Sequence, residues 1–290
     1  MEQFSALPPL TALLHQHGLW ANKGLGQHFL LQESWTKRIA LLAGDLTGVQ
    51  VVEVGPGPGG LTRALLEHTN AAHVTAIEMD RRFAPLLEPL DALHPGRFTL
   101  NFGDALKTDT VALVPAPRQV IANLPYNVGT ELLIRWLLAI AEQGPAAYTQ
   151  LVLMFQQEVG ERIRAAVNSD HYGRLAVISQ WLCKTRCGLQ VPAGAFSPPP
   201  RVESEVVVLT PYAIEDRLPC DAKALQQVTA AAFGQRRKML RGSLKTLIPQ
   251  PEILLDAAGI DGQARAETVD VAGFVRLANA WVDYRNTQTA

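Results

Sequence analysis

Val49-Gln50-Val51-Val52-Glu53-Val54-Gly55-Pro56-Gly57-Pro58-Gly59-Gly60-Leu61-Thr62 is the stretch that decides the fold of this chain. Its first part is apolar and β-branched, as in a buried strand, and the residues after it have a helical pattern. The glycines between them permit positive φ and let a ligand approach the main chain, while the helix start supplies free N–H donors. The stretch therefore predicts a strand-to-helix turn that binds a nucleotide-like cofactor, with Gly55 and Gly57 next to the ligand.

The alternation of strand and helix continues on both sides of this turn. Apolar bursts predict strands at 50–54, 73–78, 98–102, 119–123 and 149–155. Helical patterns alternate with them at 34–43, 61–69, 80–91, 130–142 and 157–167. This order is typical of a parallel sheet with helices on both faces, a Rossmann-like α/β fold.

The chain then changes character. After a predicted helix at 172–182, strand-like runs at 184–191 and 204–210 could pair as a hairpin and complete a seven-stranded sheet, with Pro192 through Pro200 as a stiff connector. Beyond a polar, proline-containing segment the patterns are only helical, at about 222–233, 236–247, 251–258 and 270–284. We predict two domains, 1–210 and 211–290, the second small and α-helical.

Carboxylates follow the next two predicted strands. Glu78 ends the strand at 73–78, where a carboxylate could bind ribose hydroxyls. Asp104 follows the strand at 98–102 and could hold the amino group of the cofactor adenine, or it could instead cap a short helix. We expect both side chains at the carboxyl edge of the sheet, where open α/β sheets bind ligands.

Two cofactors fit the glycine spacing. Gly55, Gly57 and Gly60 match the pattern G-x-G-x-x-G, and both NAD and S-adenosylmethionine carry an adenosine ribose. Pro56 and Pro58 remove two N–H donors from the turn, which disfavours a pyrophosphate. S-adenosylmethionine is therefore the preferred cofactor, and methyl transfer the preferred reaction.

Asn123-Leu124-Pro125-Tyr126 follows the apolar run at 119–122 and is typical of a site for an exocyclic base amine. An amide oxygen and a backbone carbonyl can accept hydrogen bonds from one NH2 group, proline fixes the turn, and the aromatic ring offers a stacking surface. An ordinary strand followed by a turn is the alternative interpretation of these four residues.

Six ordered blocks resemble the ribosomal RNA adenine dimethyltransferase family, and within it the bacterial enzymes that dimethylate two adjacent adenosines near the 3′ end of 16S rRNA in the small ribosomal subunit. The blocks are Lys23–Leu30, Glu53–Thr62, Ile77–Asp80, Asn123–Asn127, Phe196–Ser204 and Phe233–Arg241. The resemblance implies a class I methyltransferase domain with an N-terminal cofactor lid, and cofactor contacts from His28, Leu30 and Asn123. The family often has Asn where this chain has His28 and Gly242.

The reaction we infer is direct in-line transfer of a methyl group from S-adenosylmethionine to adenine N6. The Asn123 side chain and the Leu124 carbonyl would accept hydrogen bonds from the amine and turn its lone pair towards the methyl group. Tyr126 would stack on the flipped base, with Phe196 covering its other face. Phe196 could equally be a core residue.

The second predicted domain carries a run of basic residues. The net charge of −1, from 26 basic and 27 acidic residues, does not indicate a nucleic-acid partner. Between Ala222 and Ile248, however, there is no Asp or Glu, and the cations include Arg236, Arg237, Lys238, Arg241 and Lys245. On a continuous helix Arg237, Arg241 and Lys245 would share one face, which favours phosphate binding over an ordinary solvated surface.

Other features restrict the setting. Three cysteines, Cys183, Cys187 and Cys220, cannot all pair, and no second ligand pair completes a zinc site, so we predict no metal. Because neither a long apolar run nor a signal-like N-terminus is present, we expect a cytoplasmic protein without membrane contact. We also expect a monomer.

Three alternatives stay open from sequence. An enzyme that methylates large-subunit rRNA would share the cofactor motifs, although the basic block favours the small-subunit substrate. A DNA adenine methyltransferase would need a larger recognition domain than the helical tail. The chain could also act mainly as an RNA-binding factor in small-subunit biogenesis.

Overall fold

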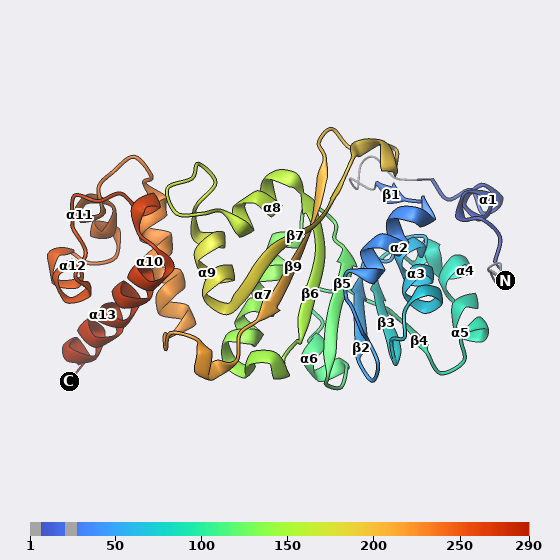
Figure 1. The fold of residues 1–290 in the computed structure, drawn as a ribbon, viewed down its shortest axis with the longest axis horizontal. Coiled ribbons are helices and arrows are strands. Elements are labelled where there is room, and N and C mark those ends of the chain that lie inside the picture. Colours follow the sequence, from blue (N-terminus) through green and yellow to red (C-terminus); the bar gives the residue numbers. More distant parts are fainter. Residues whose placement is uncertain (1–6, 21–27, 290) are drawn as a thin grey trace. The chain divides into compact units, whose positions relative to one another are not determined.

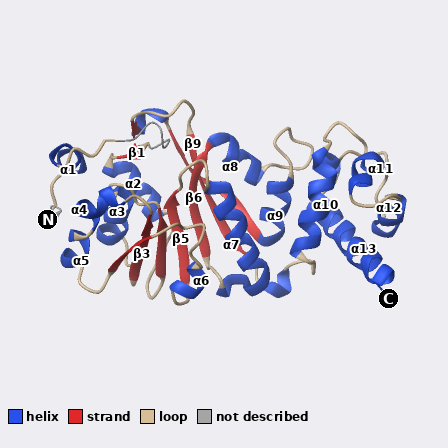
Figure 2. Cartoon of the chain, turned by 180° about the vertical axis from the view of Figure 1, so that it is seen from behind, coloured by secondary structure: helices blue, strands red, loops and turns tan. Residues whose placement is uncertain are grey.

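The computed structural model describes residues 7–20 and 28–289, which form two compact units (Figures 1 and 2). The first unit comprises Met1–Ile140, Pro145–Gly160 and Arg186–Thr210, and the second comprises Ala141–Gly144, Glu161–Thr185 and Pro211–Ala290. The sequence-based boundary assigned all of residues 1–210 to one domain, whereas the contact pattern places Glu161–Thr185 with the helical C-terminal part.

A seven-stranded sheet forms the centre of the first unit, as predicted, in the order β4-β3-β2-β5-β6-β9-β7. Neighbouring strands from β4 to β6 are parallel, and β9 runs antiparallel to β6. The predicted neighbours at 184–191 and 204–210 do lie side by side, as β7 and β9. The strands are β2 (Gln50–Val54), β3 (His73–Glu78), β4 (Phe98–Phe102), β5 (Arg118–Asn123), β6 (Gln150–Gln156), β7 (Cys183–Val191) and β9 (Ser204–Pro211).

Helices cover both faces of this sheet because its strands are apolar on both sides (Figures 1 and 2). Val51 belongs to a hydrophobic cluster that also contains residues of α2 and α3. Its neighbour Val52 is equally buried but does not belong to this cluster. Helix α7 contributes a buried stripe of its own, from Leu132 to Ile140. The helices of this part are α1 (Leu10–Gln16), α2 (Glu33–Leu41), α3 (Gly60–His68), α4 (Ala84–Leu87), α5 (Pro89–Leu93), α6 (Thr110–Leu113), α7 (Gly129–Gln143) and α8 (Gln157–Arg164).

The helix predicted at 80–91 is wrong as a continuous element. The chain instead forms a 3-10 turn at Arg81–Phe83 and then the two short helices α4 and α5. Pro85 and Pro89 lie at the first turns of these helices. Proline tolerates a first turn but interrupts a helix interior, so the two prolines divide the predicted helix.

The structure also contains a separate two-stranded ribbon, which was not predicted. β1 (Phe29–Leu30) pairs antiparallel with β8 (Phe196–Ser197), which lies inside the segment expected to be only a stiff connector. A 3-10 turn at Ala193–Ala195 precedes β8. The pairing ties the segment at 28–30 to the proline-rich segment far along the chain.

Helices build the second unit, as predicted from its periodicity. They are α9 (Arg174–Leu182), α10 (Ala222–Gly234), α11 (Leu240–Ser243), α12 (Glu252–Ala258) and α13 (Val271–Thr289). The Asp221 side chain caps α10 by accepting a hydrogen bond from the Ala224 N–H. Gly259, with φ of 64°, ends α12 in the left-handed conformation that glycine favours.

The helix predicted at 236–247 is also wrong as a continuous element, because residues 235–239 form a turn and α11 begins only at Leu240. The Leu240 N–H donates to the Ala264 carbonyl (2.8 Å) and the Arg241 N–H to the Gly262 carbonyl (3.0 Å). These donors are therefore committed to the 261–265 loop instead of to the preceding turn of a helix. Arg237 consequently does not share a helical face with Arg241 and Lys245.

No helix in the described ranges, 7–20 and 28–289, is long and apolar enough to cross a membrane.

Candidate active site

A cavity of about 120 Å³ lies at the carboxyl ends of β2, β3 and β5. The glycine turn, the end of β3, the segment after β5 and the β1 strand all contribute to its wall. Its lining residues are His28, Phe29, Leu30, Thr36, Glu53, Gly55, Pro56, Gly57, Pro58, Gly60, Leu61, Glu78, Phe83, Asn123, Leu124, Pro125 and Tyr126. The structure thus brings together most of the residues that the sequence assigned to the cofactor and to the base amine.

The glycine turn needs its glycines for two reasons. Gly55 and Gly57 adopt φ of 67° and 55°, which L-residues with a side chain rarely adopt. A Cβ on Gly55 would also lie 3.3 Å from the ring of Pro125. Glycine at this position therefore lets the cofactor turn and the Asn123–Tyr126 segment approach each other.

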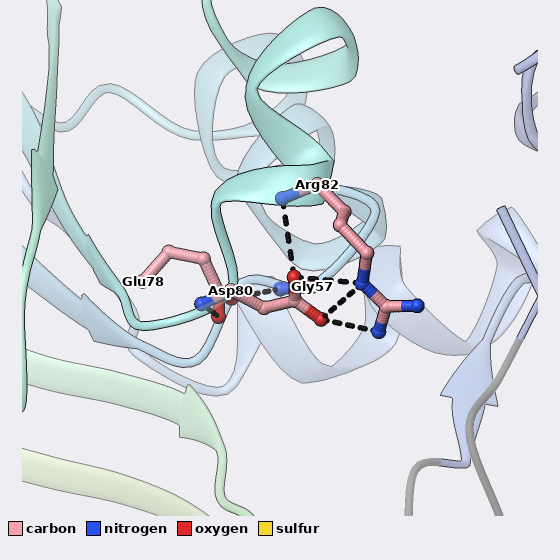
Figure 3. Close-up of polar contacts among 4 residues, drawn as sticks. All are labelled: Gly57, Glu78, Asp80 and Arg82. Atoms are coloured by element: carbon pink, nitrogen blue, oxygen red, sulfur yellow. Dashed lines mark hydrogen bonds and ion pairs between the residues drawn. The ribbon is translucent and has the colours of Figure 1, made fainter.

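Glu78 supports the glycine turn directly (Figure 3). One of its carboxylate oxygens accepts a hydrogen bond from the Gly57 N–H (2.9 Å), and the other accepts one from the Asp80 N–H (2.8 Å). Arg82 holds the Asp80 side chain in turn. Because a carboxylate has about four acceptor positions, Glu78 retains the capacity to bind ligand hydroxyls.

Burial raises the pKa of Glu78, and the N–H groups of Asp80 and Gly57 partly oppose that rise. A carboxylate that is largely shielded from water, and that already receives two backbone donors, has a fixed orientation. Glu78 therefore presents its remaining acceptor positions in one direction, as a ribose site requires.

Glu53 is a second cavity carboxyl, and the sequence did not single it out. It is only 1% exposed, and its Oε2 atom has no hydrogen-bond partner among the described residues. Burial raises its pKa from 4.5 to about 8; the Thr62 hydroxyl opposes this, and the nearby Glu78 carboxylate adds to it. At neutral pH the side chain is therefore mostly protonated. An acidic residue at the end of an otherwise apolar strand was the available signal.

The raised pKa of Glu53 makes stability depend on pH. Between pH 4.5 and about 8 the unfolded chain has lost this proton while the folded chain still holds it. The free energy of unfolding should therefore fall as pH rises, by about 1.4 kcal/mol per pH unit from this group. Above pH 8 the contribution should stay constant.

Denaturant unfolding of the wild type and of Glu53→Gln at pH 5, 6, 7 and 8 measures this effect. Glutamine has nearly the shape of the protonated acid but does not titrate, so the variant should gain stability relative to the wild type as pH rises. An identical pH dependence of the two proteins would show that Glu53 is ionised in the folded state.

The donor and acceptor set of the cavity discriminates between the two cofactors that the sequence left open. Two carboxyl groups, Glu53 and Glu78, line it, and none of its described lining residues is Lys or Arg. Such a set suits ribose hydroxyls and positively charged groups, which S-adenosylmethionine carries as a sulfonium and an ammonium. A pyrophosphate would meet two carboxyl groups and no cation, which is unfavourable. The residues therefore fit S-adenosylmethionine.

The Asn123–Tyr126 segment leaves β5 at the edge of the same cavity. Asn123 is half-buried at the end of the strand, and within the described part of the chain its side-chain amide has no hydrogen-bond partner. Leu124 is buried, and the Tyr126 ring lies half-buried 6.1 Å from the His28 ring. Asn123 and Tyr126 thus both line the cavity in which a base amine would have to lie.

Of three other residues that the sequence assigned to the cofactor, two line the cavity and one does not. His28 and Leu30 line the cavity, and the His28 Nδ1 atom is hydrogen-bonded to the Pro198 carbonyl (2.8 Å). Asp104 is not among the lining residues; its carboxylate accepts from the Leu106 N–H (2.9 Å), the capping type of role that the sequence left open. The predicted lid residues 23–27 lie outside the described part of the chain.

Phe196 is buried in the hydrophobic core with 5% of its surface exposed, and it does not line the cavity. Its backbone pairs with Leu30 in the β1–β8 ribbon. In this arrangement Phe196 offers almost no surface to a base, so the structure favours the core interpretation over the stacking interpretation.

The predicted RNA-binding residues of the second unit separate into two groups. The Arg236 guanidinium donates to the carbonyls of Ser169 and Asp170, so it holds a loop of its own unit. The remaining cations are exposed: Arg237, Lys238, Arg241 and Lys245. Arg265 joins them because it forms an antiparallel bridge with Met239. The sequence missed Arg265, since the bridge joins segments that are distant in the chain.

Comparisons with known proteins agree with this geometry. A family model described as "Ribosomal RNA adenine dimethylase" matches residues 18–283. A protein of Agrobacterium fabrum (strain C58 / ATCC 33970) named "Ribosomal RNA small subunit methyltransferase A" is 52% identical over 281 residues, which cover 96% of this chain and 99% of that protein.

Two solved structures resemble this chain. A dimethyladenosine transferase from Plasmodium falciparum has a TM-score of 0.72 at 23% identity and covers 89% of this chain and 97% of its own. The 23S rRNA methyltransferase ErmE has a TM-score of 0.63 at 26% identity and covers 88% of this chain and 99% of its own. The α/β fold of the first unit is thus that of class I methyltransferases.

Proposed function

Because the chain belongs to the ribosomal RNA adenine dimethylase family, we propose that it transfers methyl groups to N6 of two adjacent adenosines near the 3′ end of 16S rRNA, giving N6,N6-dimethyladenosine. One observation carries the proposal: Asn123, Leu124 and Tyr126 line the same cavity as the glycine turn and Glu78. A base amine and a cofactor methyl group can therefore meet in one place. The 52% identity to a small-subunit methyltransferase supports the choice of RNA.

S-adenosylmethionine supplies the methyl group as a sulfonium electrophile when it is bound. Glu78 would accept hydrogen bonds from its ribose hydroxyls, the main chain at Gly55 and Gly57 would lie against it, and Leu30 and His28 would complete the wall. Glu53 would offer its buried Oε2 atom to the cofactor, and a positive charge there would lower the pKa of this carboxyl and favour its ionised form. The Asp104 carboxylate, which already accepts from the Leu106 N–H, would use a further acceptor position for the amino group of the cofactor adenine.

The residues after β5 would orient the amine. An adenine amine is a poor nucleophile because its lone pair is delocalised into the ring. Two acceptors, the Asn123 amide oxygen and the Leu124 carbonyl, would hold both N–H groups, reduce the delocalisation of the lone pair into the ring and direct it towards the methyl group. They would also stabilise the positive charge that develops on nitrogen, so no strong base is required. Tyr126 would stack on the flipped base.

The second unit would bind the RNA. We assign phosphate contacts to the basic surface, defined as Arg237, Lys238, Arg241, Lys245 and Arg265. All five are exposed, and no carboxylate of the described residues is paired with them by an ion pair. Arg236 would support this surface by fixing the loop at Ser169 and Asp170. We propose that the protein acts as a monomer, in the cytoplasm with its ribosomal substrate.

Reversing the charge at both Arg237 and Arg241 to Glu should weaken binding to small ribosomal subunits by roughly tenfold or more at moderate salt. Fewer neutralised phosphates also means fewer released counterions, so the slope of log K against log salt should become shallower by roughly two. Filter binding across a salt series measures both quantities.

Lys223→Glu is the matched control for this pair. It reverses a charge at the first turn of α10, whereas Arg237 follows the other end of that 13-residue helix, about 20 Å away. If the control and the double variant lowered the affinity and the slope equally, the basic surface would be an ordinary solvated one.

Offering labelled S-adenosylmethionine together with small subunits, large subunits or adenine-containing duplex DNA tests the substrate. We expect label only in small-subunit RNA. Label in large-subunit RNA would favour the related activity of the enzyme on 23S rRNA, and tight binding to small subunits without any label would favour a role restricted to subunit biogenesis.

A further inference from the structure

The Tyr126 hydroxyl is hydrogen-bonded to a serine that no part of the proposed mechanism uses. It lies 2.8 Å from the hydroxyl of Ser204, and either oxygen can be the donor. Ser204 is the first residue of β9 and is completely buried. In the antiparallel register it lies opposite Gln156 of β6, which itself pairs in parallel with β5. Tyr126 follows β5, so the bond ties the amine segment to a strand two places away in the sheet.

Stacking requires a ring of fixed orientation. A tyrosine side chain has two rotatable bonds, and Tyr126 belongs to a segment with exposed neighbours, Pro125 and Asn127. A hydrogen bond at the far end of the ring opposes rotation about the Cα–Cβ bond, because that rotation would carry the hydroxyl away from Ser204. Rotation about the Cβ–Cγ bond leaves the hydroxyl oxygen on its axis, so the bond fixes where the ring lies. The centroid of the His28 ring lies 6.1 Å from that of the Tyr126 ring, and the two planes are tilted by 31°. The Tyr126 ring is therefore held at its tip and has an aromatic neighbour.

We propose that Ser204 is a positioning residue for methyl transfer: it holds the Tyr126 ring in the place where the target adenine stacks, with its amine at Asn123. Ser204 is too deeply buried to contact the base, so it acts only through Tyr126. This inference rests on the proposed function. It also gives the Phe196–Ser204 segment two tasks, since Phe196 pairs with the cavity residue Leu30 and Ser204 anchors the stacking ring.

The experiment is a double-mutant cycle of Ser204→Ala and Tyr126→Phe, assayed for methyl transfer to small subunits. Each single change removes the same hydrogen bond and retains the aromatic ring. Each should lower kcat by roughly threefold to tenfold, the usual range for one net hydrogen bond. The KM for the subunit and the affinity for S-adenosylmethionine should change little. The double variant should lose no more than either single variant.

Ser179→Ala is the matched control, because Ser179 is also fully buried but its hydroxyl has no hydrogen-bond partner among the described residues. It should leave kcat unchanged. Should Ser204→Ala fold poorly, Tyr126→Phe still removes the bond from its half-buried side. Unchanged kcat in both single variants, or losses that multiply in the double variant, would overturn the proposal.

Tyr126→Ala separates this inference from the proposed function. Loss of transfer in Tyr126→Ala with full activity in Ser204→Ala and Tyr126→Phe would refute only the anchoring role. Full activity in Tyr126→Ala would refute stacking itself, and with it the proposed use of the amine segment.

Discussion

Asn123→Ala is expected to lower the rate of methyl transfer by roughly 10²–10³-fold while most of the affinity for S-adenosylmethionine remains. The magnitude is that of deleting one preorganised group that stabilises charge in a transition state. Asn123 is free to serve in this way, because its amide lies at the cavity without a partner among the described residues. Truncation would leave the amine with one acceptor, the Leu124 carbonyl, and with its lone pair still delocalised into the ring.

Single-turnover transfer and equilibrium cofactor binding, measured on the same preparation, test this prediction. Asn127→Ala is the control, because it removes an exposed asparagine four positions further along the same segment. We expect wild-type rates from the control. A rate for Asn123→Ala within a few-fold of the wild type would show that the amide does not act on the amine.

Glu78→Ala is expected to weaken the binding of S-adenosylmethionine by roughly 10²-fold. Hydrogen bonds to a charged group contribute about 1.5–3 kcal/mol each, and a ribose offers two hydroxyls. The change would also remove the acceptor of the Gly57 N–H, so the glycine turn would lose a support that holds it in place. Both effects act on the cofactor and neither on the base amine.

Calorimetric titration with S-adenosylmethionine and with its demethylated product measures this loss. Glu88→Ala is the control, since Glu88 is exposed on the segment between α4 and α5. Glu78→Gln adds a second comparison: it retains one oxygen acceptor, so it should bind more tightly than Glu78→Ala but less tightly than the wild type. Equal affinity in the wild type and Glu78→Ala would refute the ribose assignment.

Sequence reasoning succeeded where one local pattern sufficed. The glycine turn is predicted by a local order of strand, glycines and helix. Glu78 and Asn123 are the last residues of strands that must end at the same edge of a parallel sheet. The apolar runs were long enough to place the strands within a residue or two. The cavity at that edge follows from these facts.

The remaining features depend on contacts between distant segments. The hydrogen bond from Tyr126 to Ser204 and the bridge from Met239 to Arg265 leave no trace in local periodicity. The predicted helix at 236–247 had the right composition, but tertiary hydrogen bonds from Leu240 and Arg241 redirected the backbone. Phe196 is likewise buried in a segment whose backbone pairs with Leu30, which is distant in the chain.

The most direct test of the central claim is transfer of labelled methyl groups from S-adenosylmethionine to small ribosomal subunits that lack 3′-end adenine methylation, followed by nucleoside analysis of the digested RNA. We predict N6,N6-dimethyladenosine at two adjacent positions, and its absence with Asn123→Ala. No labelled nucleoside, from protein shown to bind the cofactor, would contradict the claim that Asn123, Leu124 and Tyr126 present an rRNA adenine amine to the methyl group.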